Sequence, residues 1–595
     1  MLSKFSLRSI SFAHISLPIV GLMWALPFLY FHHAYPITTF YQEWGAALLS
    51  LCAMPLLVTK RYWQQPEIPR IVLLPVGMMM LLLLQYFMGK LLSFDQTLLF
   101  TLYLLWFALL VLLGQRLRFE LGLPLVATVL AVFLTLGAEL NAVAGIIQHY
   151  RWHTFLDTVV TVKTSAAVYG NIAQPNHFAN YLSLGLASIG LLQMRWSLRI
   201  WQTALLVTPL LFVLVLSGSR STWFYLLFMV ALAFFWQRRD KAFLPLLKYA
   251  ALLLAGFALM QLVVQIPWLA GSSGSVTTVE RMFGDETGSG GIRLYLWKEA
   301  LLIFAKYPFL GAGVGQYAWQ HFQMGAQLQD LRIVGLYNNA HNLVMQMAAE
   351  TGLAGLAIFF GTLGLWLRQV WVAQRTIYHW WGYSILAVLG IHSLLEYPLW
   401  YGYFIGVAAV ALGLMENKFY RLELRNLGRI SLGMMLLLGV LSLAQLYQGY
   451  KKLEVTLAMR PLSSVDAGYA QRLRESLVAV HQYTLLRPYA ELFMTGMIDV
   501  SPDHLADKMM LNERSMRFIP IAPVVYRHAS LLAMADRLPE AKLQLHQALW
   551  SYPAEFRGAL TGLQQMAHKD PAHFSALLEF ATQKNEEYQR AVLAK

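Results

Sequence analysis

The 595-residue chain contains a single cysteine, Cys52, and few charged residues. One cysteine excludes an intramolecular disulfide and a cysteine-based metal cluster. Charged residues make up 13% of the chain, whereas a soluble domain usually carries about a quarter. The shortage is uneven, because long apolar runs recur as far as about Ala444 and more polar sequence follows. Runs of roughly 16–25 apolar residues are long enough to cross the core of a bilayer.

The apolar runs predict an all-α, polytopic membrane protein with about thirteen transmembrane helices. They occupy 1–447, which we expect to be a transmembrane catalytic domain. The remainder, 448–595, is expected to be a small C-terminal helical domain. The predicted spans are 16–31, 42–59, 71–88, 97–114, 123–147, 177–193, 200–217, 221–236, 243–264, 341–367, 378–395, 399–415 and 429–447.

Lysine and arginine give the chain a formal net charge of +14, and they gather in alternate connections between the predicted spans. Because these residues favour the cytoplasmic side, the pattern places the N-terminus inside. The segment 149–176, the long connection 265–340 and the C-terminal domain are then expected outside. Membrane orientation explains the positive charge better than nucleic-acid binding, because no basic stripe with interleaved aromatic residues is present.

The long connection contains GSSGSVTTVERMFGDETGSGG, whose glycine and serine content favours mobility. Long loops in compact proteins are often lids or binding elements, and a plain connector is the alternative. The following IRLYLWKEALLIFAKYP has helical apolar spacing and predicts a helix on the membrane or over a cavity. In the C-terminal domain, 523–553 resembles one tetratricopeptide unit. That domain is expected either to hold a protein partner or to brace the long connection.

Four hydrogen-bonding side chains precede or open the helix predicted after Pro175. They belong to YGNIAQPNHFANYL and stand where a helix N-terminus can receive an anion or a sugar. Ordinary capping of a membrane helix is the alternative interpretation. The four residues are Asn171, Gln174, Asn176 and His177.

Arginines form a second group at the predicted outer face. Arg220 lies in SGSRSTW between two spans, and Arg293 lies in GIRLYLW. A guanidinium presents a planar fork of donors that fits phosphate oxygens. For Arg220, a side chain that simply reaches toward the lipid headgroups is the alternative. Arg281, in the same connection as Arg293, is a further candidate.

The segment YNNAHNLVMQMAAETGLAGL supplies a candidate base. His341 stands at the mouth of a predicted span, beside Asn342, and Glu350 lies about 14 Å deeper along the helix. A histidine there can accept a proton near neutral pH, or it can be a structural hydrogen-bonding residue. Further on, HSLLEYPLWYGY places Tyr397 and Trp400 at the outer face, where aromatic side chains stack on sugars or form a membrane belt.

Several motifs together resemble those of a known family. SGSRSTW, GIRLYLW, PFLGAGVGQY and NNAHNLVMQMAAETGLAG, in this order, resemble the O-antigen ligase and polymerase superfamily over about 170–415. HHAYPITTFYQEW, GNIAQPNHFANYL and LLEYPLWY resemble, within it, bacterial protein O-oligosaccharyltransferases of the pilin-glycosylating type. The resemblance implies a GT-C-like glycosyltransferase of the bacterial inner membrane. Its active site, long connection and C-terminal domain would face the periplasm.

By this resemblance the donor is an oligosaccharide on undecaprenyl pyrophosphate, within the membrane lipids. The acceptor is a serine or threonine hydroxyl of an exported protein such as a type IV pilin. His341 matches the family's essential histidine, and Arg220 and Arg293 match arginines proposed to hold the pyrophosphate. Gln174 and Tyr397 match positions thought to matter in the protein-glycosylating branch. The chemistry agrees, because arginines stabilise a leaving pyrophosphate and a histidine can accept the hydroxyl proton.

Other functions remain open from the sequence. An O-antigen ligase would use lipid A core as acceptor with the same chemistry, although the subgroup motifs and the helical tail argue against it. A glycan polymerase is a second alternative, and a polyprenyl-glycan transporter is a third. Transporters often contain internal repeats with helices broken at mid-membrane, and no such repeat is found. We expect no catalytic metal, because HExxH and DxD-like motifs are missing from the predicted outer face. No cofactor is expected either.

Overall fold

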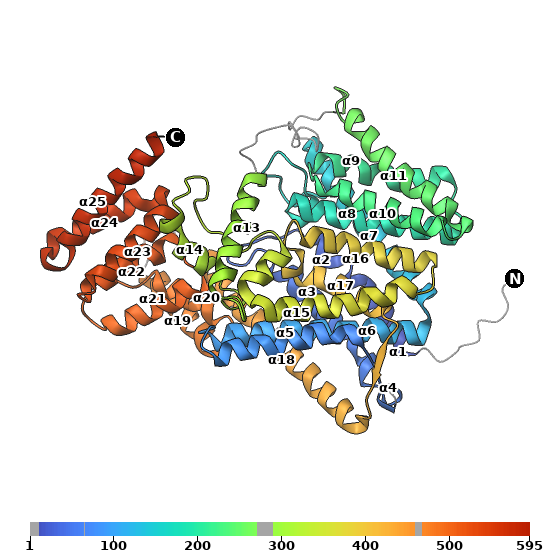
Figure 1. Ribbon diagram of the computed structural model, residues 1–595, viewed down its shortest axis with the longest axis horizontal. Helices are drawn as coiled ribbons and strands as arrows, with labels where there is room; N and C mark the ends of the chain where they lie inside the picture. The colour runs from blue at the N-terminus through green and yellow to red at the C-terminus, as the bar shows by residue number, and fades with distance from the viewer. Residues whose placement is uncertain (1–10, 65, 270–288, 459–466, 595) are drawn as a thin grey trace. The chain divides into compact units, whose positions relative to one another are not determined.

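The protein is helical almost throughout the residues that the computed structural model describes, which are 11–64, 66–269, 289–458 and 467–594 (Figure 1). The predicted all-α class is therefore confirmed. One small addition is a pair of three-residue strands, β1 (Glu67–Pro69) and β2 (Phe419–Arg421), which pair antiparallel. They join two connections that are distant in sequence.

All of the predicted spans lie on helices. Their bounds in chain order are α1 (Phe12–Met23) with α2 (Leu26–Leu29), α3 (Phe40–Ala53), α5 (Leu73–Phe87), α6 (Phe94–Leu121), α7 (Leu123–Tyr150), α8 (Pro175–Trp196), α9 (Ile200–Leu216), α10 (Ser221–Gln237), α11 (Leu244–Val263), α15 (Leu343–Val372), α16 (Ile377–Ser393), α17 (Gly402–Met415) and α18 (Arg425–Ala458). A short helix, α4 (Lys60–Gln64), precedes β1.

Seven helical stretches in the described part of the chain are long and apolar enough to cross a membrane, and three shorter helices are also apolar. A multi-pass membrane protein is thereby confirmed, while the number of crossings and their orientation stay predictions. The seven are Phe12–Leu29, Arg70–Phe87, Phe94–Leu121, Leu123–Tyr150, Lys241–Val263, Leu343–Val372 and Arg425–Ala458.

Contacts divide the described residues into two compact units. The first unit comprises 1–77, 102–286 and 358–443, and contains most of the apolar helices. The second comprises 78–101, 287–357 and 444–595. The C-terminal domain expected over 448–595 is thus one part of a larger unit, which also includes the second half of the long connection and the turn between α5 and α6.

In the first unit, α6 and α17 approach closely at two points, and at each point one of the two residues is a glycine. A Cβ atom on Gly114 of α6 would lie 2.3 Å from the carbonyl oxygen of Val410 on α17, and one on Gly413 of α17 would lie 2.0 Å from that of Val111. Glycine is therefore required at both positions for this contact. Small residues at helix crossings are the usual means of packing in membranes, where van der Waals contact replaces hydrophobic burial as the driving force.

In the second unit, the C-terminal helices form a core with α14 (Tyr317–Leu328) from the long connection. Trp319 and Phe322 of α14 belong to this core. The main-chain N–H of Gly335 also donates to the Ser551 carbonyl over 2.7 Å. Bracing of the long connection, one of the two expected roles, is thus observed. The C-terminal helices are α19 (Ala467–Tyr483), α20 (Arg487–Thr495), α21 (Leu505–Phe518), α22 (Ala522–Met534), α23 (Leu538–Ser551), α24 (Pro553–Lys569) and α25 (Pro571–Leu593).

The helix pair α22 and α23 covers the segment that resembles a tetratricopeptide unit. Ala529, Ala541 and Ala548 are buried, with at most 1% of their surface exposed. Small side chains at these positions allow two antiparallel helices to pack closely, as that repeat requires. The expected pair of helices is present.

Candidate active site

The second unit fixes the backbone around His341. His341 lies just before α15 in a left-handed conformation, with φ 49°. Its main-chain N–H donates to the Asn339 side chain over 3.1 Å. The Asn342 side-chain oxygen accepts from the N–H groups of Val344 and Met345, at 3.0 and 3.1 Å, and so caps α15. The asparagines of NNAHN therefore hold the histidine at the helix entrance, in a conformation that L-residues rarely adopt.

Both main-chain groups of Ala340, the residue before His341, are also bound. Its N–H donates to Oε1 of Gln346 over 2.7 Å, and its carbonyl accepts from the Trp297 indole over 3.0 Å. Trp297 lies on α13 (Ser289–Lys306), four residues after Arg293, so the two share a helix face. The hydrogen bond from Trp297 thus brings the face that carries Arg293 toward the segment of His341. A helix was expected over IRLYLWKEALLIFAKYP, and α13 begins at Ser289, about one turn before Arg293.

The helix α15 is broken at Gly352, eleven residues beyond His341, which the sequence did not predict. Gly352 has φ 61° and ψ −157°, so the hydrogen-bond ladder is interrupted. The segment that follows α13 satisfies the freed groups. Leu353 and Ala354 donate to the carbonyls of Pro308 and Phe309 at 2.8 and 3.0 Å. Irregular backbone at this depth is tolerated only where protein satisfies its polar groups.

The motif PFLGAGVGQY supplies the other side of this junction. Ala312 and Gly313 donate to the carbonyls of Ala349 and Glu350 at 2.9 and 3.1 Å. Gly311 has φ 70°, and a Cβ atom there would lie 2.1 Å from the Glu350 carbonyl carbon. Backbone meets backbone at this point, so only glycine fits.

Glu350, a predicted substrate-binding residue, is buried within this junction. It is 3% exposed, and its Oε1 accepts from the Tyr317 N–H over 3.1 Å. These contacts tie the carboxylate to the start of α14. They favour a supporting role over direct contact with a glycan.

Two residues that sequence reasoning did not select complete the junction. Gln85 of α5 donates to the carbonyls of Leu310 and Glu350 at 2.6 and 2.8 Å, and its Oε1 accepts from the Val314 N–H over 3.1 Å. Lys90 donates to the Gly311 carbonyl over 2.7 Å. The sequence did contain a signal for Gln85, which stands alone after the apolar run MMMLLLL. A polar side chain inside a membrane helix usually has a specific partner.

Glu299 and His321 form a second unselected pair, in the long connection. His321 Nδ1 lies 2.9 Å from Glu299 Oε2, and both side chains are buried. The Tyr317 hydroxyl donates to the Leu296 carbonyl over 2.8 Å nearby. The pair packs α14 against α13, and thereby supports the helix that carries Arg293.

In the first unit, the start of α8 gathers several predicted residues. The Gln174 side chain caps α8 by accepting from the N–H of His177. The Asn176 amide donates to Glu396 over 2.7 Å. The His177 ring contacts that of Tyr397 edge to face, with 5.7 Å between centroids. The structure therefore brings these four predicted residues together and adds Glu396, which is buried.

A buried polar chain continues from this cluster into the helices. His177 Nδ1 lies 2.8 Å from His392 Nε2, and the Tyr225 hydroxyl lies 2.8 Å from His392 Nδ1. None of the three side chains is more than 2% exposed. The chain fixes α8 to α10 and α16 and orients the His177 ring.

Asn171 takes part in backbone contacts. Its amide nitrogen donates to the carbonyls of Leu29 and Val159 at 2.9 and 2.8 Å, and its oxygen accepts from the Thr161 N–H over 3.0 Å. Its own carbonyl also contacts His33 Nε2 at 2.8 Å. Asn171 is thus placed to fasten the segment before α8 to the first connection, rather than to present its amide to a ligand.

The remaining predicted residues are placed as follows. Arg220 is exposed at the N-cap of α10, in the first unit. Trp400 is 41% exposed in the same unit. Arg281 lies outside the described residues. No cluster of three potential metal ligands occurs among the residues that the structure describes.

Comparison with known proteins reveals three matching families. Residues 204–360 match O-Antigen ligase, residues 168–192 match Protein glycosylation ligase, and residues 380–561 match Virulence factor membrane-bound polymerase, C-terminal. The chain is 26% identical over 453 residues to a General O-oligosaccharyltransferase of Acinetobacter baylyi, covering 73% of this chain and 75% of that protein. These matches confirm the resemblance stated from the motifs, and with it the expected class of enzyme.

Proposed function

We propose that this chain, a membrane glycosyltransferase similar to the O-antigen ligases and to their protein-glycosylating type, is a protein O-oligosaccharyltransferase. It transfers a preassembled oligosaccharide from undecaprenyl pyrophosphate to serine or threonine hydroxyls of exported proteins, such as a type IV pilin. The reaction takes place at the periplasmic face of the bacterial inner membrane. The observation that carries the proposal is the fixed backbone around His341, pinned from the same helix face that bears Arg293.

In the proposed reaction, the acceptor oxygen attacks the anomeric carbon of the first sugar. The bond from that carbon to the pyrophosphate oxygen breaks, and the electron pair leaves with the pyrophosphate. Arg293 and Arg220 are assigned to the charge that grows on the leaving oxygens, where bidentate donors stabilise the transition state more than the ground state. His341 is assigned to the hydroxyl proton, which it accepts as general base.

The cluster at the start of α8 is assigned to glycan recognition. Gln174 and Asn176 stand at a helix N-terminus with amide groups suited to hydroxyls, and the buried His177 beside them supports their placement. Tyr397 and Trp400 offer aromatic faces on which sugars stack. Asn171, Asn342 and Glu350 act as positioning residues, because their side chains hold main-chain groups. Arg281 stays a candidate for the pyrophosphate.

Transfer to lipid A core is the second candidate function, and the match of 204–360 to O-Antigen ligase favours it. The chemistry at the anomeric carbon would be unchanged. The two candidates differ only in the acceptor, so the acceptor must be measured directly.

The test is co-expression of the chain with a defined lipid-linked glycan pathway and a candidate pilin, followed by intact-mass measurement of the pilin. We expect a mass gain of one whole glycan, absent from His341→Ala. His153→Ala is the matched control, because this outer-segment histidine is exposed, with 94% of its side chain accessible. Glycan on lipid A core with no gain on any exported protein would refute the proposal. Full transfer by His341→Ala would refute the assignment of His341 as the general base.

A further inference from the structure

The turn between α5 and α6 lies at a membrane face by its position in the chain. It joins the candidate spans Arg70–Phe87 and Phe94–Leu121 through only 88–93. Four apolar side chains around it are exposed: Phe87 by 81%, Met88 by 56%, Leu92 by 53% and Phe94 by 58%. Exposed apolar groups gathered in this way mark contact with a membrane or a partner. Between two spans, the bilayer is the available apolar phase.

A pocket of about 160 Å³ opens beside this turn, within the second unit. Helices α20 and α21 form its other wall, and Gln316, at the N-cap of α14, also lines it. Its charged lining consists of Asp95, Glu491, Arg487, Arg514 and Arg517.

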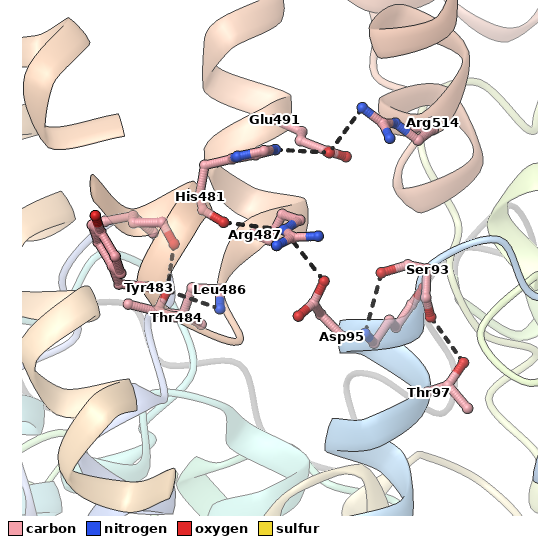
Figure 2. A network of polar contacts seen from close by, with 12 residues as sticks. Ser93, Asp95, Thr97, His481, Tyr483, Thr484, Leu486, Arg487, Glu491 and Arg514 are labelled. Atoms are coloured by element: carbon pink, nitrogen blue, oxygen red, sulfur yellow. Dashed lines mark hydrogen bonds and ion pairs between the residues drawn. The ribbon is translucent and has the colours of Figure 1, made fainter. Parts of the chain in front are cut away.

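Ion pairs occupy two of its three arginines (Figure 2). Arg487 Nε lies 3.5 Å from Asp95 Oδ2 and also donates to the His481 carbonyl over 3.0 Å. Arg514 Nη2 lies 3.2 Å from Glu491 Oε1. These pairs orient the guanidinium groups and connect the tail helix α20 to the start of α6.

The third arginine, Arg517, has no carboxylate partner within the described residues. Its guanidinium lies over the Trp319 ring, 4.6 Å from the centroid. Its buried Nε has no hydrogen-bond partner among the described atoms. With three arginines against two carboxylates, the pocket carries one positive charge in excess. A guanidinium that no carboxylate neutralises favours an anionic ligand, to which its terminal N–H groups can donate.

We propose that this pocket binds the phosphate of an anionic phospholipid headgroup, with Arg517 as its principal donor. A lipid fits better than an acidic peptide, because the apolar side chains around the turn would enter the acyl region beside the bound headgroup. Binding would fasten α20 and α21 to the bilayer surface. The inference depends on the turn lying at a membrane face and is independent of the proposed glycan transfer.

The test is native mass spectrometry of the full chain in detergent, titrated with phosphatidylglycerol or with phosphatidylcholine of the same acyl chains. We expect preferential retention of phosphatidylglycerol. Arg517→Gln should weaken that retention about fivefold, the effect typical of one basic residue near an anionic surface. Arg557→Gln is the matched control, since Arg557 is exposed on α24, and it should leave retention unchanged.

Arg517→Lys keeps the charge and guards against a folding defect, so it should retain more phosphatidylglycerol than Arg517→Gln. Equal loss in Arg517→Gln and Arg557→Gln would overturn the proposal, as would equal retention of the two lipids by the unmodified chain. Undecaprenyl pyrophosphate and a tetraglutamate peptide serve as competing probes. If binding of either probe depended on Arg517 while binding of phosphatidylglycerol did not, the phospholipid proposal would be overturned. The pocket would then be assigned to the glycan donor or to the acceptor protein.

Discussion

Replacing Gly311 by alanine should break the junction that supports α15. The new Cβ atom would lie 2.1 Å from the Glu350 carbonyl carbon and 2.3 Å from the Thr351 nitrogen. These are main-chain atoms that cannot rotate away, so the segments must separate by more than 1 Å to reach ordinary contact, roughly 3.5 Å. The left-handed backbone at φ 70° costs alanine a further ~1 kcal/mol relative to glycine.

Separation would also weaken two hydrogen bonds, from Ala312 to Ala349 and from Gly313 to Glu350. Each contributes about 1 kcal/mol, so the total loss is about 3 kcal/mol. For a unit of roughly 150–250 residues, 1 kcal/mol lowers the unfolding midpoint by about 2–4 °C. We therefore expect a decrease of roughly 6–12 °C in detergent, with reduced glycan transfer.

Thermal unfolding of the purified full chain, followed by tryptophan fluorescence, measures this loss. Gly361→Ala is the control, because Gly361 lies on the same helix and a Cβ atom there would meet nothing within 4 Å. If both variants unfolded within about 1 °C of the unmodified chain, the backbone contact would not carry the stability assigned to it, and the reasoning would be refuted.

Gln85→Leu should lower the free energy of unfolding by about 3 kcal/mol, because three hydrogen bonds disappear. Met80→Leu, at an exposed site on α5, is the control and should be neutral in the same thermal assay. Equal unfolding midpoints for the two variants would contradict the expectation. Arg220→Lys should slow transfer about tenfold, since an ammonium cannot replace a bidentate fork; an unchanged rate by intact mass would indicate simple contact with headgroups. Burial lowers the pKa of His528, so the unfolded chain binds more protons near pH 6 and stability should fall as the pH drops below about 6.5. His528→Leu should flatten that dependence of the unfolding midpoint, and an unchanged slope would exclude His528 as its source.

The helices were predictable because an apolar run long enough to cross a bilayer must satisfy its main-chain N–H and C=O groups internally, and an α-helix does so. The predicted spans 123–147 and 221–236 fall on α7 and α10. The strand pair between Glu67–Pro69 and Phe419–Arg421 was not predictable. Its strands have three residues each and are joined by a contact remote in sequence, which leaves no local pattern to detect.

The site was predictable by residue type and only partly by role. NNAHN indicated His341 from the sequence, and the structure adds that its asparagines cap and pin the backbone. The break at Gly352 was missed, because one glycine in an apolar helix normally leaves it continuous. Here the freed groups of Leu353 and Ala354 find partners forty-five residues earlier in the chain, at Pro308 and Phe309, and no local sequence pattern indicates such a contact.

The break at Gly352 affects how α15 can adapt to bilayers of different thickness. A continuous rod adapts to a thinner or thicker membrane by tilting along its whole length. We expect a helix that ends and restarts to tilt mainly beyond its break, because 343–354 is fastened by main-chain hydrogen bonds to the neighbouring segment of the same unit. We therefore expect the entrance of α15, with its histidine, to respond little to changes in membrane thickness. Transfer rates should vary little with acyl-chain length, whereas Gly311→Ala should make them depend on it.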